Sequence, residues 1–150
     1  MTLTPDGRYA ISASDDYTLG VWDRQSEGIL TLHGHKDKVR AVTVTSDGRY
    51  IISASADRTL KVWDLHLGCV VHTLHGHTDS VTAVAVIPNS HCAISSSDDH
   101  SLIVWDLWSG QALTAVTLDN VLWGVAVAPD GATILTGDMT GNVYCLRYVG

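Results

Sequence analysis

The stretch Leu60-Lys61-Val62-Trp63-Asp64 ends in a dipeptide that occurs three times in the chain. The other copies of the dipeptide are Trp22-Asp23 and Trp105-Asp106, and the tryptophans are 41 and 42 residues apart. A period of this length is typical of a repeated unit of four short β-strands. We infer that one structural unit is copied along the chain, and that the fold follows from this unit.

Turn sequences repeat with the same period. They are Pro5-Asp6-Gly7, Ser46-Asp47-Gly48, Pro88-Asn89-Ser90 and Pro129-Asp130-Gly131. Pro, Asp, Asn and Gly favour turns because they tolerate or fix the backbone angles that turns require. The last copy is degenerate, since Leu146-Arg147 stands where the others have Trp-Asp. Terminal repeats are often atypical in this way. We expect a single domain over 1–150 with units of about 1–32, 33–74, 75–117 and 118–150.

Runs rich in β-branched residues alternate with Gly, Asp, Asn and Ser, a pattern that indicates a meander of antiparallel strands. The first four residues are expected to end an innermost strand. The other strands are predicted at 8–14, 18–23, 28–32, 39–44, 50–55, 59–64, 69–74, 81–86, 92–97, 102–106, 112–117, 122–127, 132–136 and 142–147. The chain is therefore predicted to be all-β, with four antiparallel sheets, the last of them three-stranded.

The composition is that of a globular protein, with 45% hydrophobic and 17% charged residues. Sixteen acidic residues outnumber nine basic ones, and the net charge of -7 argues against a general affinity for nucleic acid. We expect neither a signal peptide nor a membrane span. Three cysteines cannot close a disulfide framework within one chain, so we predict reduced, buried thiols in a cytoplasmic protein.

Two copies share a longer signature. In one it runs from Gly34-His35 through Ser53 and Asp57 to Trp63-Asp64, and in the next from Gly76-His77 through Ser95 and Asp99 to Trp105-Asp106. His and Asp are 22 residues apart in both copies, and Asp and Trp are 6 apart. On these residues the chain resembles the WD-repeat (WD40) β-propeller family over essentially its whole length. The resemblance implies a propeller of four-stranded blades.

The resemblance also implies a buried relay in each blade, in which a Trp indole meets a Ser hydroxyl, the hydroxyl meets a His ring, and the ring meets an Asp carboxylate. The implied relays are Trp63, Ser53, His35, Asp57 and Trp105, Ser95, His77, Asp99. The first copy keeps Ser12, Asp16 and Trp22 without a histidine, so we expect its relay to be weaker. Removing one member of a complete relay leaves its neighbour unpaired, at about 1 to 3 kcal/mol.

A Ser-His-Asp set also invites a hydrolase interpretation. The set occurs twice with identical spacing, no Gly-x-Ser-x-Gly elbow surrounds either serine, and the indole would occupy the hydroxyl. We therefore predict a structural role, with no catalytic residues and no cofactor. Among the remaining histidines, His33, His72 and His75 lack a Cys or carboxylate at a metal-site spacing, so no metal site is predicted.

Propellers of this family bind partners around the central opening, and the resemblance transfers that role to ten positions. They are Lys38, Arg40 and Ala56; Ser80, Thr82 and Asp98; Val121, Trp123 and Met139; and Asp15. Trp123 stands out because its sister positions are Arg40 and Thr82. It is either an anchor for the partner, as Trp often is at interfaces, or a cover for the weaker core of the last blade.

Four blades are few for this family, whose rings usually have seven or eight. We therefore expect a second copy of the chain to complete the ring. A closed four-bladed monomer and a piece of a longer ring remain open alternatives. The final residues resemble the last blade of bacterial multi-repeat proteins, some of which carry a NACHT-type signalling ATPase. The predicted function is a non-catalytic scaffold that binds protein or peptide, and the alternative is a sensor module of such an ATPase.

Overall fold

The computed structural model describes residues 1–150 and consists of fifteen strands joined by turns, without a helix. Every predicted strand is present, with bounds that differ by at most two residues. The strands are β1 (Thr2–Leu3), β2 (Tyr9–Ala13), β3 (Leu19–Asp23), β4 (Gly28–Leu32), β5 (Val39–Val44), β6 (Tyr50–Ser55), β7 (Leu60–Asp64), β8 (Cys69–Leu74), β9 (Val81–Val86), β10 (Cys92–Ser97), β11 (Ser101–Asp106), β12 (Gln111–Thr117), β13 (Leu122–Val127), β14 (Thr133–Asp138) and β15 (Val143–Arg147).

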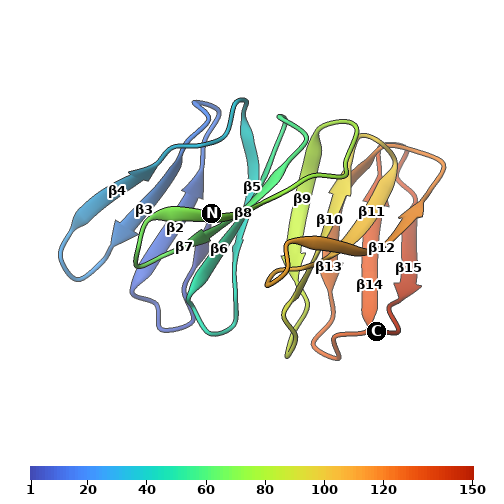
Figure 1. The fold of residues 1–150 in the computed structure, drawn as a ribbon. Coiled ribbons are helices and arrows are strands. Elements are labelled where there is room, and N and C mark those ends of the chain that lie inside the picture. Colours follow the sequence, from blue (N-terminus) through green and yellow to red (C-terminus); the bar gives the residue numbers. More distant parts are fainter.

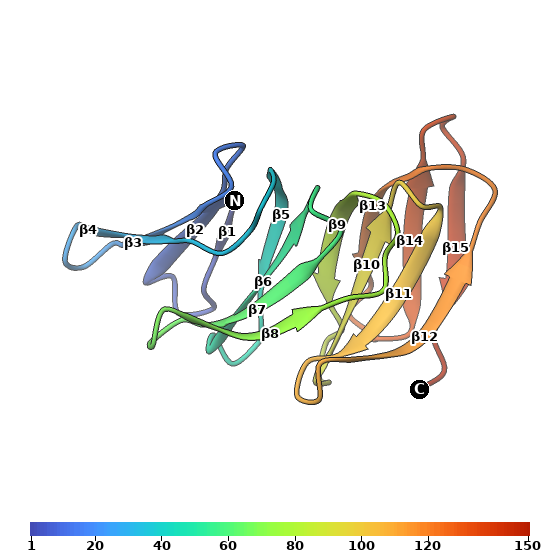
Figure 2. The same cartoon turned by 45° about the horizontal axis from the view of Figure 1, so that its top comes forward.

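The strands form four antiparallel sheets in sequence order, which we call blades 1 to 4. Blades 1, 2 and 3 are β1–β4, β5–β8 and β9–β12, and blade 4 is the three-stranded sheet β13–β15. Each blade packs against the next, and blades 1 and 4 lie at opposite ends of the molecule (Figures 1 and 2). The blades thus form an open arc, so the closed four-bladed monomer is not what the structure shows.

The hydrophobic core consists of three layers, one between each pair of neighbouring blades. In β6, Ile51 belongs to the layer shared with blade 1, and Ile52 belongs to the layer shared with blade 3. Successive side chains of a strand point to opposite faces, which is why one strand serves two layers. Blades 2 and 3 are consequently apolar on both faces, and burying each Leu or Ile contributes roughly 1.5 to 3 kcal/mol.

The outer face of blade 4 keeps apolar residues without a neighbouring blade. Leu135 and Val143 are 44% and 72% exposed, and they occupy the register positions of Ile52 and Leu60 in blade 2, which are fully buried. Cys145 lies on the same face and is exposed. The end face of the arc therefore repeats the pattern of an internal face.

The prediction of buried thiols is wrong. Cys69 and Cys145 are exposed, and Cys92 is half-buried. Cys69 begins β8, the outermost strand of its blade, and Cys145 faces outward from blade 4, so no other sheet covers them. All three cysteines are free, as expected for an odd number without paired spacing.

The repeated Asp-Gly turns connect the first two strands of a blade. Gly48 has a φ of 72°, in the left-handed region that favours glycine, and the Thr45 hydroxyl donates to the Asp47 carboxylate at 2.6 Å. Blade 3 has Ser90 in place of the glycine, and there Asn89 takes the left-handed conformation with a φ of 57°. Asn tolerates this region better than most residues, so the turn survives without glycine.

Candidate functional site

The glycine of each Gly-His pair allows the loop between two blades to lie against a tryptophan. A Cβ on Gly34 would stand 3.0 Å from the Trp63 ring, and a Cβ on Gly76 would stand 3.0 Å from the Trp105 ring. Such distances are too short for a real side chain without movement of the ring. Glycine therefore lets the loop approach closely enough to place the following histidine inside the blade.

The predicted relay is complete in blade 2. Trp63 Nε1 donates to Ser53 Oγ at 2.8 Å, and Ser53 Oγ lies 2.7 Å from His35 Nε2. His35 Nδ1 lies 2.8 Å from Asp57 Oδ2. The His35 side chain is completely buried. The four residues thus connect the loop before β5, strand β6, the β6–β7 turn and strand β7 through buried hydrogen bonds.

The direction of these bonds follows from the donors. The indole N–H can only donate, so Ser53 accepts it and uses its own hydrogen toward His35 Nε2. Nδ1 of His35 then carries the proton that is donated to Asp57. Burial opposes ionisation of Asp57, but hydrogen bonds from His35, Thr59 and the backbone N–H of Lys36 outweigh it and hold the Asp57 pKa below its ordinary range.

Blade 3 repeats this geometry. Trp105 Nε1 donates to Ser95 Oγ at 2.8 Å, His77 Nε2 lies 2.7 Å from Ser95 Oγ, and His77 Nδ1 lies 2.8 Å from Asp99 Oδ2. Burial lowers the pKa of His77, although the bond to Asp99 opposes the shift. Burial likewise opposes ionisation of Asp99, yet bonds from Ser101, the Thr78 N–H and His77 lower its pKa. The relay therefore favours a neutral histidine beside an ionised aspartate.

The three relay residues of blade 1 do not form a relay, and the expectation of a weaker one needs correction. No hydrogen bond joins Ser12 to Trp22 or to Asp16, and Trp22 is 47% exposed. Asp16 instead accepts bonds from the N–H and hydroxyl of Thr18 within its own turn. The cause is physical: blade 1 has no histidine to connect serine and aspartate, and no preceding blade covers the indole.

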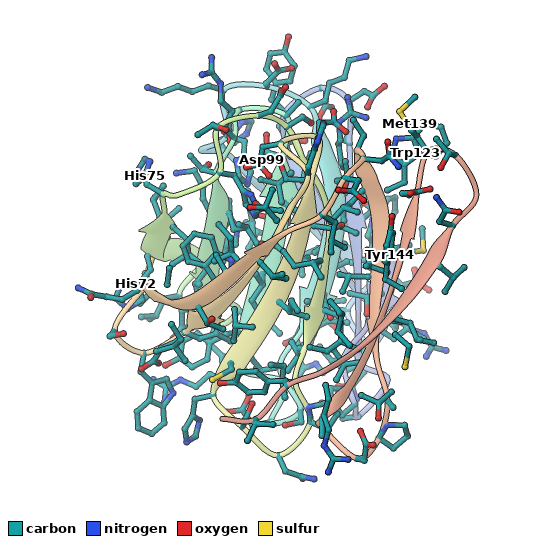
Figure 3. The ribbon with its side chains drawn as sticks, turned by 90° about the vertical axis from the view of Figure 1, so that its right-hand side faces the viewer. His72, His75, Asp99, Trp123, Met139 and Tyr144 are labelled. Atoms are coloured by element: carbon teal, nitrogen blue, oxygen red, sulfur yellow. The ribbon has the colours of Figure 1, made fainter.

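Blade 4 replaces the relay by a different network, which the sequence analysis missed. Asp138 takes the register position of Ser55 and Ser97. Its carboxylate accepts hydrogen bonds from Asn120, Thr140, Asn142 and Tyr144. Burial opposes ionisation of Asp138, but these bonds together hold its pKa well below the ordinary value. Tyr144 lies on β15, on the side of the molecule that faces the viewer in Figure 3.

The relay serines are not arranged for catalysis. Ser53 and Ser95 are completely buried, and each hydroxyl is engaged by an indole and an imidazole. A nucleophilic serine needs free approach of the substrate and donors for the oxyanion, and the buried hydroxyls lack the first. No three His, Cys, Asp or Glu side chains gather closely enough to hold a metal ion. No helix suited to crossing a membrane is found.

The residues predicted for the partner face converge around the inner strands. Five of them, from all four blades, line one hollow of about 620 Å³ together with Ala13 and Val39. The five are Asp15, Arg40, Thr82, Asp98 and Trp123. Trp123 is 62% exposed, which favours a role as an anchor for a partner over a role as a core cover. We call the ten predicted residues the central face.

Polar contacts hold parts of the central face in place. Lys38 Nζ lies 3.5 Å from Asp15 Oδ2 and links blades 2 and 1. The Thr82 hydroxyl donates to the Leu122 carbonyl at 2.6 Å and links blades 3 and 4. Burial raises the pKa of Asp98, and the positive charge of Arg40 opposes this shift. The hollow therefore combines both signs of charge beside an exposed indole.

The other five members of the central face do not line this hollow, and Ser80 is buried, so its prediction as an accessible partner-binding residue is wrong. The N–H groups of Ala56, Asp98 and Met139 donate to the carbonyls of Lys38, Ser80 and Val121 at 2.9, 2.9 and 3.0 Å. In blades 2, 3 and 4 this hydrogen bond places the residue that follows the second strand of the blade beside the start of the innermost strand. Met139 is exposed next to Trp123 at one upper corner of the molecule (Figure 3).

Comparison with known families agrees with this architecture. The family model described as WD domain, G-beta repeat matches residues 1–23, 26–64 and 68–106, which together are more than half of the chain. The matched segments end at Asp23, Asp64 and Asp106, the aspartates of the three Trp-Asp pairs. No curated protein matches the chain. The repeats, the four sheets and the two buried relays agree, and the chain belongs to the WD40 family.

Proposed function

We propose that the chain is a non-catalytic scaffold that binds a protein or peptide on the central face. The observation that carries the proposal is the convergence of residues from four blades on one hollow beside the exposed Trp123. WD40 repeats generally mediate protein–protein interaction. The surface itself has suitable chemistry, because Trp, Met and Arg are enriched at protein interfaces.

The composition of the central face indicates how a partner is held. Trp123 provides apolar area in the hollow, Met139 is exposed in the following β14–β15 turn, and Arg40 lies near Asp98. A partner segment with an apolar side chain next to a charged one matches this combination. Trp123 is the expected anchor, since tryptophan truncation at the centre of an interface typically costs at least about 2 kcal/mol.

A pull-down with matched tryptophan variants tests the proposal. Trp123→Ala should reduce capture of the partner by at least about tenfold. Trp108→Ala serves as the control, because Trp108 is similarly exposed but lies in the β11–β12 turn. There its ring centroid is 3.9 Å from that of His91. If Trp123→Ala and Arg40→Ala both captured the partner as well as the wild-type chain does, the binding surface would lie elsewhere.

The end faces of the arc support the second part of the proposal, that a second copy of the chain completes the ring. Leu135, Val143 and Cys145 present the same pattern that blade 2 turns toward blade 3. At the other end of the arc, Trp22 is exposed, whereas the corresponding tryptophans of blades 2 and 3 are buried against the preceding blade. If blade 4 of each copy packed against blade 1 of the other, both end faces would be covered. The resulting ring would have two-fold symmetry and eight blades.

Solution mass tests the dimer. Light scattering after size separation should give twice the chain mass of 16.1 kDa, and Leu135→Lys should give a monomer because it places a charge on the blade 4 end face. Leu67→Lys is the control, since Leu67 is exposed in the β7–β8 turn, away from both end faces. A wild-type monomer at every concentration would rule out the dimer.

The finer assignments from the resemblance stay predictions. These are the cytoplasmic location, the bacterial type of the repeats and the sensor role beside a NACHT-type ATPase. No contact in the structure favours the sensor role over the scaffold.

A further inference from the structure

A second hollow lies at the junction of blades 2 and 3, and none of its lining residues belongs to the central face. Its volume is about 590 Å³, and no apolar side chain lines it. His75, one of its lining residues, lies at the opposite edge of the molecule from Trp123 (Figure 3). The loops before β5 and β9 and the β6–β7 turn contribute to it. It is therefore a separate site, and its occupant need not be the partner of the central face.

This hollow is basic, although the chain as a whole carries a net charge of -7. Lys36, Arg58 and Lys61 line it, and none of them forms an ion pair with a carboxylate. Its one aspartate, Asp57, is already engaged by His35, Thr59 and the Lys36 N–H. Three cations thus face the hollow without a bound counter-charge of their own.

Comparison of the blades shows that the blade itself does not require these cations. Thr78, His100 and Ile103 occupy the corresponding positions in blade 3. Tyr17 and Gly20 occupy the positions of Arg58 and Lys61 in blade 1. The backbone is the same, since Arg58, His100 and Tyr17 all have left-handed φ angles of 71°, 70° and 76°. Blade 2 alone carries the three cations, so a role outside the fold explains them better.

Hydrogen-bond donors complete the site. Lys61 Nζ donates one bond to Thr73 Oγ1 at 2.9 Å and keeps two further N–H groups. The Thr73 hydroxyl accepts that bond, and its own hydrogen has no acceptor among its contacts. Two ammonium groups, a guanidinium and a hydroxyl around one hollow suit a compact dianion with several acceptor oxygens, which describes a phosphate monoester.

We propose that this hollow binds a phosphate monoester carried on a peptide, such as a phosphoserine segment. The peptide is the favoured carrier because the hollow is much larger than a phosphate group and is open to solvent, which leaves room for flanking residues. The acidic surface disfavours long polyanions and membrane surfaces, whereas one phosphate needs only the local cations. Lys61 and Arg58 hold the phosphate oxygens, and Lys36 approaches from the loop before β5.

Titration followed by NMR tests the proposal with three probes: the peptide Gly-Gly-phosphoserine-Gly-Gly, its unphosphorylated form and inorganic phosphate. The phosphopeptide should bind, with shifts at the backbone amides of 58–61. The unphosphorylated peptide should not bind, and inorganic phosphate should bind more weakly than the phosphopeptide. Equal binding of both peptides overturns the proposal, and inorganic phosphate binding as tightly as the phosphopeptide overturns the assignment of a peptide carrier.

Variants that copy blade 3 locate the site. Lys36→Thr, Arg58→His and Lys61→Ile together introduce residues that the sister blade already tolerates, and they should weaken phosphopeptide binding by more than about tenfold. Arg24→Gln is the matched control, because it removes a cation in the β3–β4 turn that lies outside both the hollow and the central face, and it should leave binding unchanged. Thermal melting confirms that each variant folds. Unchanged binding in a folded triple variant overturns the proposal.

Discussion

Blades 1 and 2 carry serine, aspartate and tryptophan at identical spacing, yet only blade 2 forms a relay. Blade 2 receives His35 from the loop that precedes it, and blade 1 covers its Trp63. Blade 1 receives neither a histidine nor a cover, and its Trp22 is half exposed. The comparison teaches that the relay belongs to the junction between two blades and not to a single blade.

The largest expected difference between the two blades is in their tryptophans. Trp63→Ala should lower the free energy of unfolding by about 3 to 5 kcal/mol, because it opens a cavity in the layer shared with blade 1. In the monomer obtained with Leu135→Lys, Trp22→Ala should lower it by less than about 1 kcal/mol, because half of the ring then meets solvent. Urea unfolding measures both. Similar losses in that monomer would contradict the exposure of Trp22, whereas a large loss for Trp22→Ala in the otherwise wild-type chain is what a completed ring requires.

The relay serines give a smaller contrast. Ser53→Ala leaves the Trp63 indole and the His35 ring without their shared partner, and should destabilise the fold by about 1 to 3 kcal/mol. Ser12→Ala, the matched change in blade 1, breaks no relay bond and should cost less than about 0.5 kcal/mol. The same unfolding experiment compares them. A loss for Ser12→Ala as large as that for Ser53→Ala would contradict the absence of a relay in blade 1.

The pH dependence of the free energy of unfolding distinguishes a junction with a relay from a junction without one. The pKa of His77 is lowered from its ordinary value of 6.5, so below this pH the unfolded chain takes up a proton that the folded chain resists. Stability should therefore fall as the pH decreases through 6.5, and fall again below 3.8, where the unfolded state protonates Asp99 while the folded state keeps it ionised.

Urea midpoints at about pH 7.5 and about pH 5 measure the first step. His77→Ala should lower stability at both pH values but reduce the difference between them. His75→Ala, which changes an exposed neighbour outside the relay, should leave that difference as in the wild type. A wild-type stability that rises on acidification would be evidence against a neutral buried histidine.

The smallest effect is expected at the central face. Trp123→Ala should change the free energy of unfolding by less than about 0.5 kcal/mol, because the ring is exposed and packs little against blade 4. Set beside Trp63, this variant separates a tryptophan needed for folding from one available for binding. A large loss of stability would support the alternative role of Trp123 as a core cover.

Much of the fold and of the two relays could be predicted because the signals are short in sequence and repeated. Strand bounds followed from alternating runs and turn residues, and the pairs His35 with Asp57 and His77 with Asp99 followed from the resemblance to the WD40 family. The missing relay of blade 1 was only partly anticipated. The lack of a histidine in blade 1 was visible in the sequence, but the exposure of Trp22 was not, because it depends on which sheets lie beside the indole.

Other features had no clear sequence signal. The Asp138 network replaces the relay pattern with different residues, and only the run Gly137-Asp138-Met139-Thr140-Gly141-Asn142 marks it. The hollow at the junction of blades 2 and 3 is built from loops and strands of two repeats, so its lysines and arginine look like separate surface charges in the sequence. Exposure of Cys69 and Cys145 likewise depended on which sheets lie beside them.

The sequence by itself determined the repeated unit and its four-stranded pattern, because strand periodicity and turn chemistry act over a few residues within each copy. The tertiary structure alone decided that the blades form an open arc, which faces stay uncovered and which side chains share a hollow. These properties depend on packing between residues about one repeat apart or more. Burial and charge at such junctions are set by both partners together, and no single repeat contains that information.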